Sequence, residues 1–171
     1  MSDQTKKITD RIELRQVVMP DDEEFLIALY FTTRYDVDLL PFDDAGKKAF
    51  MAMQYKAQKL HYDEYFKHAS HDIVLYDGEP AGRYMIDTRD DEIIGVDLSL
   101  LPPYRSLGIG SILMKGTFEE ARAANLPFVF HVRQDNFRAI KLYERLGCRV
   151  RGDRDGHYKM EWRARDENPG E

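Results

Sequence analysis

The segment 105–111, Arg-Ser-Leu-Gly-Ile-Gly-Ser, has the composition of a phosphate-binding turn. It follows Pro102 and Pro103, which cannot donate to a sheet ladder and therefore end the preceding strand. A helical pattern begins directly after it, and the first N–H groups of a helix lack partners and carry about half a positive charge. Glycines let a phosphate approach this backbone, and Arg105 adds a fixed charge. The segment alone fits either an anion site or an ordinary turn at a helix start.

Two familiar nucleotide-binding motifs do not fit the spacing of this segment. A dinucleotide fingerprint needs a third glycine three residues after Gly110, where the chain has Leu113. A P-loop needs Gly-Lys-Ser/Thr, whereas Lys115 here precedes Gly116. Because glycine within a helix costs about 1 kcal/mol relative to alanine, Gly116 is predicted to pack closely against the sheet.

A second group of residues with possible chemistry lies at 136–147. Asn136, Ala139, Ile140 and Tyr143 fall at i, i+3, i+4 and i+7, so they share one face of a predicted helix that Gly147 ends. Asn136 is also a good helix cap, and Tyr143 fits an ordinary core position. Taken singly, each residue is explained by structure without any chemistry.

The elements that must position these residues follow the order β-α-α-β-β-β-α-β-α-β-β. Strands are expected at 12–18, 71–76, 82–88, 92–101, 128–132, 148–150 and 158–162, and helices at 20–34, 43–66, 107–124 and 137–145. Pro20 is taken as the first helical position, and strand 128–132 as buried on both faces. Asp77-Gly78 predicts a hairpin whose loop Glu79 and Pro80 lengthen. One α+β (mixed α/β) domain over 1–171 is predicted, a mostly antiparallel sheet flanked by helices on both sides, with a frayed tail at about 164–171.

Composition limits the classes of function. Hydrophobic residues make up 43% and charged residues 33% of the 171 residues, as in a soluble globular protein, and no apolar run could cross a bilayer. The net charge is −6 and the basic residues are dispersed, which argues against nucleic-acid binding. The first residues lack a signal-peptide pattern, and Cys148 is the sole cysteine. We expect a cytoplasmic protein with no membrane partner, either a monomer or a homodimer.

Taken together, the two segments resemble the GNAT family of N-acetyltransferases. That family has Arg/Gln-x-x-Gly-x-Gly/Ala after a central strand, then a strand, Asn, Ala and a Leu-Tyr-x-x-x-Gly-Phe ending. The matching residues are Arg105, Gly108, Gly110, Asn136, Ala139, Leu142, Tyr143 and Gly147. Cys148 replaces the usual Phe, and we expect a buried structural thiol, since direct transfer needs no covalent enzyme intermediate.

The resemblance implies a GNAT-like acyl-CoA N-acyltransferase fold and direct transfer of acetyl from acetyl-CoA to a primary amine in a ternary complex, without a metal. Backbone groups of Leu98 and Leu100 would bond the pantetheine amides, and the Leu100 N–H would polarise the thioester carbonyl. Asn136 and Ala139 would line the pantetheine arm. The full set of implied cofactor-binding residues is Leu98, Leu100, Arg105, Ser106, Leu107, Gly108, Ile109, Gly110, Ser111, Asn136, Ala139 and Tyr143.

The resemblance also implies an acid and a base. An amine of pKa about 10.4 must lose a proton before it attacks, and Asp97 on the central strand is our first candidate base. The alternative for Asp97 is a solvent-facing or cross-strand-paired carboxylate, and His131 is the second candidate. Tyr143 would protonate the departing thiolate.

The acceptor is not identified by the sequence. The aromatic residues of the second predicted helix are more typical of a core than of a ligand cage. His61, His68 and His71 lack metal-ligand spacing. A protein acceptor, or a non-catalytic sensor of acyl-CoA, remains an alternative to an enzyme acting on a small amine.

Overall fold

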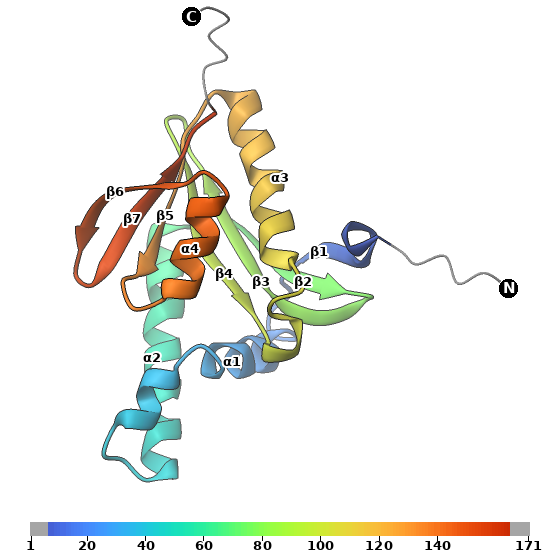
Figure 1. The fold of residues 1–171 in the computed structure, drawn as a ribbon. Helices are drawn as coiled ribbons and strands as arrows, with labels where there is room; N and C mark the ends of the chain where they lie inside the picture. Colours follow the sequence, from blue (N-terminus) through green and yellow to red (C-terminus); the bar gives the residue numbers. More distant parts are fainter. Residues whose placement is uncertain (1–6, 165–171) are drawn as a thin grey trace, which may run out of the picture. The chain divides into compact units, whose positions relative to one another are not determined.

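The structure is a computed structural model that describes residues 7–164. Its elements are β1 (Ile12–Gln16), α1 (Glu23–Phe31), α2 (Asp44–Tyr65), β2 (Ser70–Tyr76), β3 (Glu79–Thr88), β4 (Ile93–Leu100), α3 (Ile109–Ala124), β5 (Phe128–Arg133), α4 (Phe137–Arg145), β6 (Arg149–Arg154) and β7 (His157–Trp162) (Figure 1). Short 3-10 helices span Ile8–Arg11, Tyr35–Leu39 and Pro102–Tyr104. The predicted order of helices and strands is confirmed. The tail predicted to fray lies, from residue 165 on, outside the described residues.

The strands form one seven-stranded sheet in the order β1-β2-β3-β4-β5-β7-β6. β1 and β2 are antiparallel, as are β5 and β7 and β6 and β7, whereas β4 and β5 run parallel. The predicted class, a mixed α/β fold with a mostly antiparallel sheet flanked by helices, is confirmed.

Contacts between Cα atoms divide the chain into two compact units. The first unit comprises residues 1–85 and 97–107, and the second comprises 86–96 and 108–171. β3 and β4 each run from one unit into the other. That all residues form a single domain stays a prediction.

In the first unit, α1 and α2 share a core with β2. Leu26 and Tyr30 of α1, Tyr55 of α2 and Ile73 of β2 form one buried cluster. The Tyr30 and Tyr55 rings meet edge to face at 5.7 Å, a favourable geometry for aromatic pairs. This core fixes α1 and α2 against β2.

The start of α2 follows the prediction, and the start of α1 does not. The Asp43 side chain accepts a hydrogen bond from the Gly46 N–H at 2.8 Å and so caps α2. α1 begins at Glu23 rather than Pro20, because a turn closed by the Asp22 N–H and the Val18 carbonyl precedes it.

The β2–β3 hairpin has a two-residue turn, Asp77-Gly78. Both residues have positive φ, 53° and 84°, as a type I′ turn requires. β3 begins at Glu79, so the prediction that Glu79 and Pro80 lengthen the loop is wrong. A type I′ turn matches the right-handed twist of the two strands, so the hairpin needs no further loop residues.

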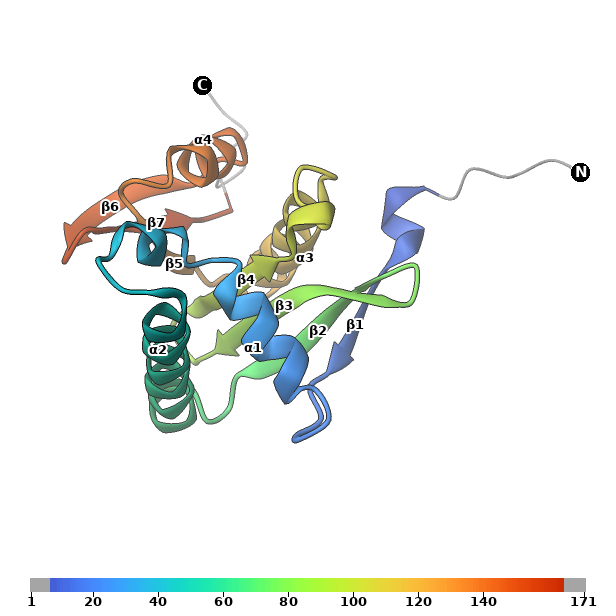
Figure 2. The ribbon, with the colours of Figure 1, turned by 90° about the horizontal axis from the view of Figure 1, so that it is seen from below.

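In the second unit, α3 and α4 cover the same face of β5 (Figure 2). Phe128 packs on Phe118 of α3 at 5.9 Å, and Phe130 packs on Tyr143 of α4 at 4.7 Å. Alternate residues of a strand face the same side, so both helices lie over one surface. Burial on both faces holds for Phe128 to Phe130, but His131 is exposed, which corrects that part of the prediction.

Gly116 lies on the outer side of α3. A Cβ built there would meet nothing within 4 Å, and the residue is exposed. Its predicted close packing against the sheet is therefore wrong, because Leu113, Thr117 and Phe118 form the buried face. Within residues 7–164, no helix is long and apolar enough to span a membrane.

Candidate active site

The predicted phosphate segment opens α3 through left-handed backbone conformations. In the second unit, Gly108 is the N-cap of α3 with φ 85°, and a Cβ there would meet nothing within 4 Å. Ile109, 1% exposed, anchors the first turn. The N–H groups of Gly110 and Ser111 lie in this turn, where a helix supplies no partner. An anion could therefore reach these donors without meeting a side chain at Gly108.

Arg105 acts within the first unit as a clamp. Its Nε donates to the Leu100 carbonyl at 2.8 Å, and its Nη2 donates to the Thr32 carbonyl at 3.1 Å and hydroxyl at 2.9 Å. These bonds tie the end of β4 to the end of α1. The structure thus gives Arg105 a positioning role beside its predicted charge, while Ser106 has φ 68° and Leu107 is exposed.

Gly82 lets β3 approach the end of β4 closely. A Cβ at this position would lie 2.2 Å from the Ser99 carbonyl oxygen and 2.7 Å from Leu100 Cδ2. The Leu101 N–H donates to the Ala81 carbonyl at 2.8 Å, which holds the same approach. The backbone of Leu98 and Leu100, predicted to bond pantetheine, is positioned by this contact.

Asn136 and Tyr143 belong to α4 in the second unit. Asn136 Oδ1 accepts from the Ala139 N–H at 3.2 Å, so Asn136 caps the helix. The half-buried Tyr143 ring packs edge to face on Phe130. Gly147, with φ 92°, ends α4: its N–H donates to the Glu144 carbonyl and the next N–H to the Tyr143 carbonyl, a Schellman motif. The structural roles that the sequence left open for Asn136 and Tyr143 are therefore both present.

Asp97 takes part in a buried ion pair across two strands of the first unit. Its Oδ2 accepts from the guanidinium of Arg83, which is 5% exposed, and its Oδ1 accepts from the Ser99 hydroxyl at 2.6 Å. Arg83 also donates to Gln58 Oε1 at 3.0 Å and lies over the Tyr62 ring. The cross-strand-paired alternative for Asp97 is the one that the structure shows. Its role as a base stays a prediction.

A cavity of about 300 Å³ opens beside this ion pair, within the first unit. Its polar lining includes Tyr55, Lys59, Tyr62, Asp63, His71 and Arg83. Burial raises the pKa of Tyr62, and Asp97 raises it further, so the phenol stays protonated and can donate a hydrogen bond. His71 Nε2 and Arg83 Nε are buried without a hydrogen-bond partner in the part of the chain that the structure describes. Both residues belong to the lining of this cavity.

Sequence reasoning missed Arg83 and Gln58, and it took Tyr62, with the other aromatic residues of its helix, as more typical of a core than of a site. A usable signal existed for Arg83, because an arginine inside the apolar strand Ala81–Ile86 must have an anionic partner when buried. Asp97 was the acidic residue on the following strand. Gln58 carried no such signal.

The remaining candidates lie in the second unit. His131 is exposed as a residue, but part of its imidazole is shielded from water, and this partial burial, followed by the charges of Lys159 and His157, lowers its pKa. Cys148 is 3% exposed and unpaired, and burial raises the pKa of its thiol to about 12, so a thiolate nucleophile is disfavoured. No cluster of metal-ligating side chains occurs among residues 7–164.

Comparison with known proteins identifies one family. The model of the acetyltransferase (GNAT) family matches residues 35–148, which include both the phosphate segment and Asn136–Gly147. Among curated protein sequences, none matches this chain.

Solved structures share the fold at low sequence identity. A PaiA N-acetyltransferase from Thermoplasma acidophilum, in complex with coenzyme A, is 17% identical, covers 90% of this chain and 99% of its own, and has a TM-score of 0.67. Arabidopsis thaliana Naa50, in complex with the bisubstrate analogue CoA-Ac-MVNAL, is 18% identical, covers 90% of this chain and 99% of its own, and has a TM-score of 0.59. The Campylobacter jejuni N-acetyltransferase PseH, in complex with acetyl coenzyme A, is 19% identical, covers 89% of this chain and 98% of its own, and has a TM-score of 0.55.

Proposed function

Because the chain belongs to the acetyltransferase (GNAT) family, we propose that it transfers the acetyl group of acetyl-CoA directly to a primary amine. The family match over residues 35–148 carries this proposal, since it spans the phosphate segment, β4 and α4 together. The complexes of PaiA, Naa50 and PseH with coenzyme A or its derivatives support acetyl-CoA as the donor. The single buried cysteine fits a reducing compartment, and a cytoplasmic location is part of the proposal.

In this proposal, backbone N–H groups bind acetyl-CoA. The first-turn N–H groups of α3, opened by Gly108, bind the pyrophosphate, and the end of β4 near Leu98 and Leu100 binds pantetheine. The Leu100 N–H stabilises the oxyanion that develops on the thioester carbonyl. Tyr143 protonates the leaving thiolate.

Asp97 removes the proton of the amine in this proposal. Arg83 and Ser99 fix the orientation of its carboxylate through an ion pair and a hydrogen bond. The amine proton passes to this carboxylate directly or through a water molecule. Because Arg83 and Ser99 already engage both oxygens of the Asp97 carboxylate, a second candidate function is a non-catalytic sensor of acyl-CoA.

Thiol release from acetyl-CoA, measured across a panel of small amines and amino-terminal peptides, separates the two functions. An enzyme releases thiol faster with one acceptor class than without acceptor, whereas a sensor binds the donor and releases none.

In an enzyme, Tyr143→Phe should lower kcat and leave the dissociation constant of acetyl-CoA nearly unchanged. Unchanged kcat would remove Tyr143 from the acid role.

Donor binding is tested first, by thermal stability. Acetyl-CoA at 100 times its dissociation constant should add about 2.7 kcal/mol to the free energy of unfolding. No stabilisation at millimolar acetyl-CoA would contradict both the enzyme and the sensor.

A further inference from the structure

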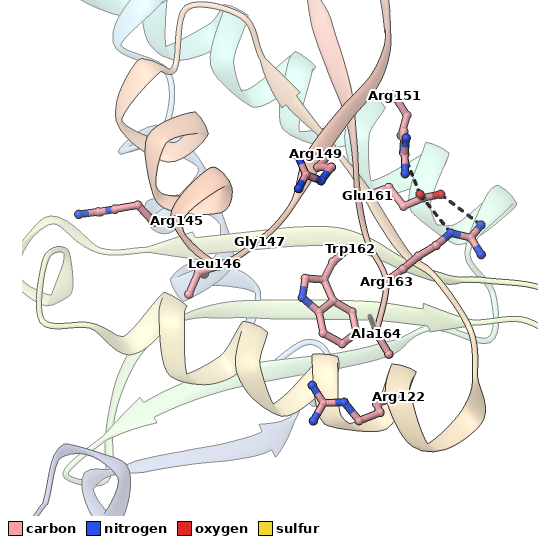
Figure 3. Close-up of a pocket in the computed structure, with 10 residues that line it drawn as sticks. All are labelled: Arg122, Arg145, Leu146, Gly147, Arg149, Arg151, Glu161, Trp162, Arg163 and Ala164. Atoms are coloured by element: carbon pink, nitrogen blue, oxygen red, sulfur yellow. Dashed lines mark hydrogen bonds and ion pairs between the residues drawn. The ribbon is translucent and has the colours of Figure 1, made fainter. Parts of the chain in front are cut away.

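A pocket of about 800 Å³ in the second unit is lined by five arginines (Figure 3). They are Arg122 of α3, Arg145 at the end of α4, Arg149 and Arg151 of β6, and Arg163 after β7. We call this the arginine pocket. It is formed by segments far apart in sequence, while the predicted phosphate segment is at the opposite, N-terminal end of α3.

The charges around the arginine pocket are not balanced. Among the described residues that line it, Glu161 is the one acidic side chain. Its carboxylate is shared by Arg151, with Nε at 2.9 Å, and by Arg163, with Nε at 3.1 Å. One carboxylate between two guanidinium groups leaves a net positive charge, although the whole chain carries −6.

Arg122 and Arg149 lie on either side of the pocket wall and can bind a ligand, whereas Arg145 lies apart from the other arginines in Figure 3. Arg122 pairs with Glu119 at 3.2 Å, but both side chains are more than half exposed, and such pairs are weak. Arg149 makes no hydrogen bond or ion pair with any side chain between residues 7 and 164 that the structure describes. Figure 3 shows these two guanidinium groups on opposite sides of Trp162. Arg149 can turn toward an anion without losing a contact, and Arg122 can do so at the expense of its pair with Glu119 and its contact with the Trp162 ring.

Trp162 forms a rigid wall of the arginine pocket. One face of its indole stacks on Phe118 at 4.5 Å with planes 3° apart, Arg122 lies over its ring at 5.8 Å, and the residue is 8% exposed. One face of the indole is thus already covered by Phe118. The five guanidinium groups make charge and hydrogen bonds the main basis of recognition in this pocket.

We propose that the arginine pocket binds a small molecule carrying two or more phosphate groups, at a site separate from the donor site. Guanidinium groups pair with phosphate and carboxylate oxygens alike, but the arginines here come from different elements and surround the space. A phosphate offers oxygens in several directions and more charge than a planar carboxylate. The volume is that of a nucleotide-sized ligand rather than of a single ion.

The test is calorimetric titration of the full chain with inorganic triphosphate and, separately, with ADP. The variant Arg122→Gln/Arg149→Gln should bind both probes at least about tenfold more weakly, since charge-assisted hydrogen bonds are lost. The control is Arg154→Gln, which removes a fully exposed arginine of the same strand, outside the pocket, and should bind like the parent. Triphosphate binding as tight as or tighter than ADP binding indicates recognition of phosphates alone, and tighter ADP binding indicates nucleoside contacts as well.

Three results would overturn the proposal: no saturable binding of either probe at millimolar concentration, equal binding by the double variant and the parent, or loss of coenzyme A binding in parallel with triphosphate binding. The last would assign the arginines to the donor site. If the double variant does not fold, Arg149→Gln alone serves, because this exposed side chain has no described partner to lose.

Discussion

Gly82 and Gly116 show how differently a missing side chain matters at two positions of one chain. Gly82 faces backbone, with the Ser99 carbonyl oxygen 2.2 Å from the site of a Cβ. Gly116 faces open space in the middle of a helix. The first glycine permits a close approach of two strands, and the second contributes only backbone freedom, which weakens a helix.

Substitution of each glycine by alanine should therefore have opposite effects on the free energy of unfolding. Gly82→Ala must displace the end of β4 and should lower it by about 1–3 kcal/mol, as overpacking does. Gly116→Ala should raise it by about 0.5–1 kcal/mol. Urea unfolding of both variants measures the two effects with the same chemical change. Stabilisation by Gly82→Ala would mean that β3 and β4 are further apart than described.

At the scale of single residues, His71 should make the free energy of unfolding depend on pH. Burial, and next the charge of Arg83, lower the pKa of His71 from its ordinary 6.5, so the folded protein keeps it neutral. The unfolded chain takes up the proton below about pH 6.5, so the free energy of unfolding should fall as the pH falls from 7.5 to 5.5. His131, whose pKa is also lowered, contributes in the same direction.

Removing these imidazoles should flatten the pH dependence of stability stepwise. His71→Gln should lose less stability than the parent between pH 7.5 and 5.5, and His71→Gln/His131→Gln should lose less still. The measurement is urea unfolding at both pH values. A steeper loss in either variant than in the parent would contradict the direction of the pKa shifts.

At the scale of elements, α4 is set by its two ends. Asn136 caps the first turn, and Gly147 adopts the left-handed conformation that closes the last. Between them, Tyr143 is oriented by its packing on Phe130. The position of the proposed acid thus depends on residues whose own roles are structural.

Asn136 can be tested for its capping and its predicted cofactor-binding roles separately. Asn136→Ala should lower the free energy of unfolding by about 1 kcal/mol, because the Ala139 N–H loses its acceptor. Asn136→Asp retains an acceptor oxygen and should keep the stability. If the amide also donates to acetyl-CoA, both variants should bind the cofactor more weakly. Parent-like affinity in Asn136→Asp would leave Asn136 as a cap alone.

At the scale of the whole molecule, the order of elements was predictable because each boundary carries a local signal. Pro102-Pro103 ends β4, Asp77-Gly78 turns the chain, and Gly147 ends α4. The Arg83–Asp97 pair was only partly predictable, from a charged residue in an apolar strand and an acidic residue on the next, and the arginine pocket was not predictable, since tertiary packing brings its residues together. No local pattern says which distant arginines will share a pocket.

The two compact units can unfold either together or one after the other. β3 and β4 run through both units, so opening either unit removes strand residues that continue into the other. We therefore expect one cooperative transition, as for the predicted single domain of residues 1–171. Trp162, the sole tryptophan, lies in the second unit against Phe118, so its fluorescence reports that unit.

Far-UV circular dichroism reports helices of both units, including the 22 residues of α2 in the first. Urea curves followed by tryptophan fluorescence and by circular dichroism should coincide in midpoint and slope. A helical signal that persists after the fluorescence change is complete would show that residues 1–85 and 97–107 fold independently. The chain would then contain two domains, and each stability effect argued above would have to be assigned to the unit that carries it.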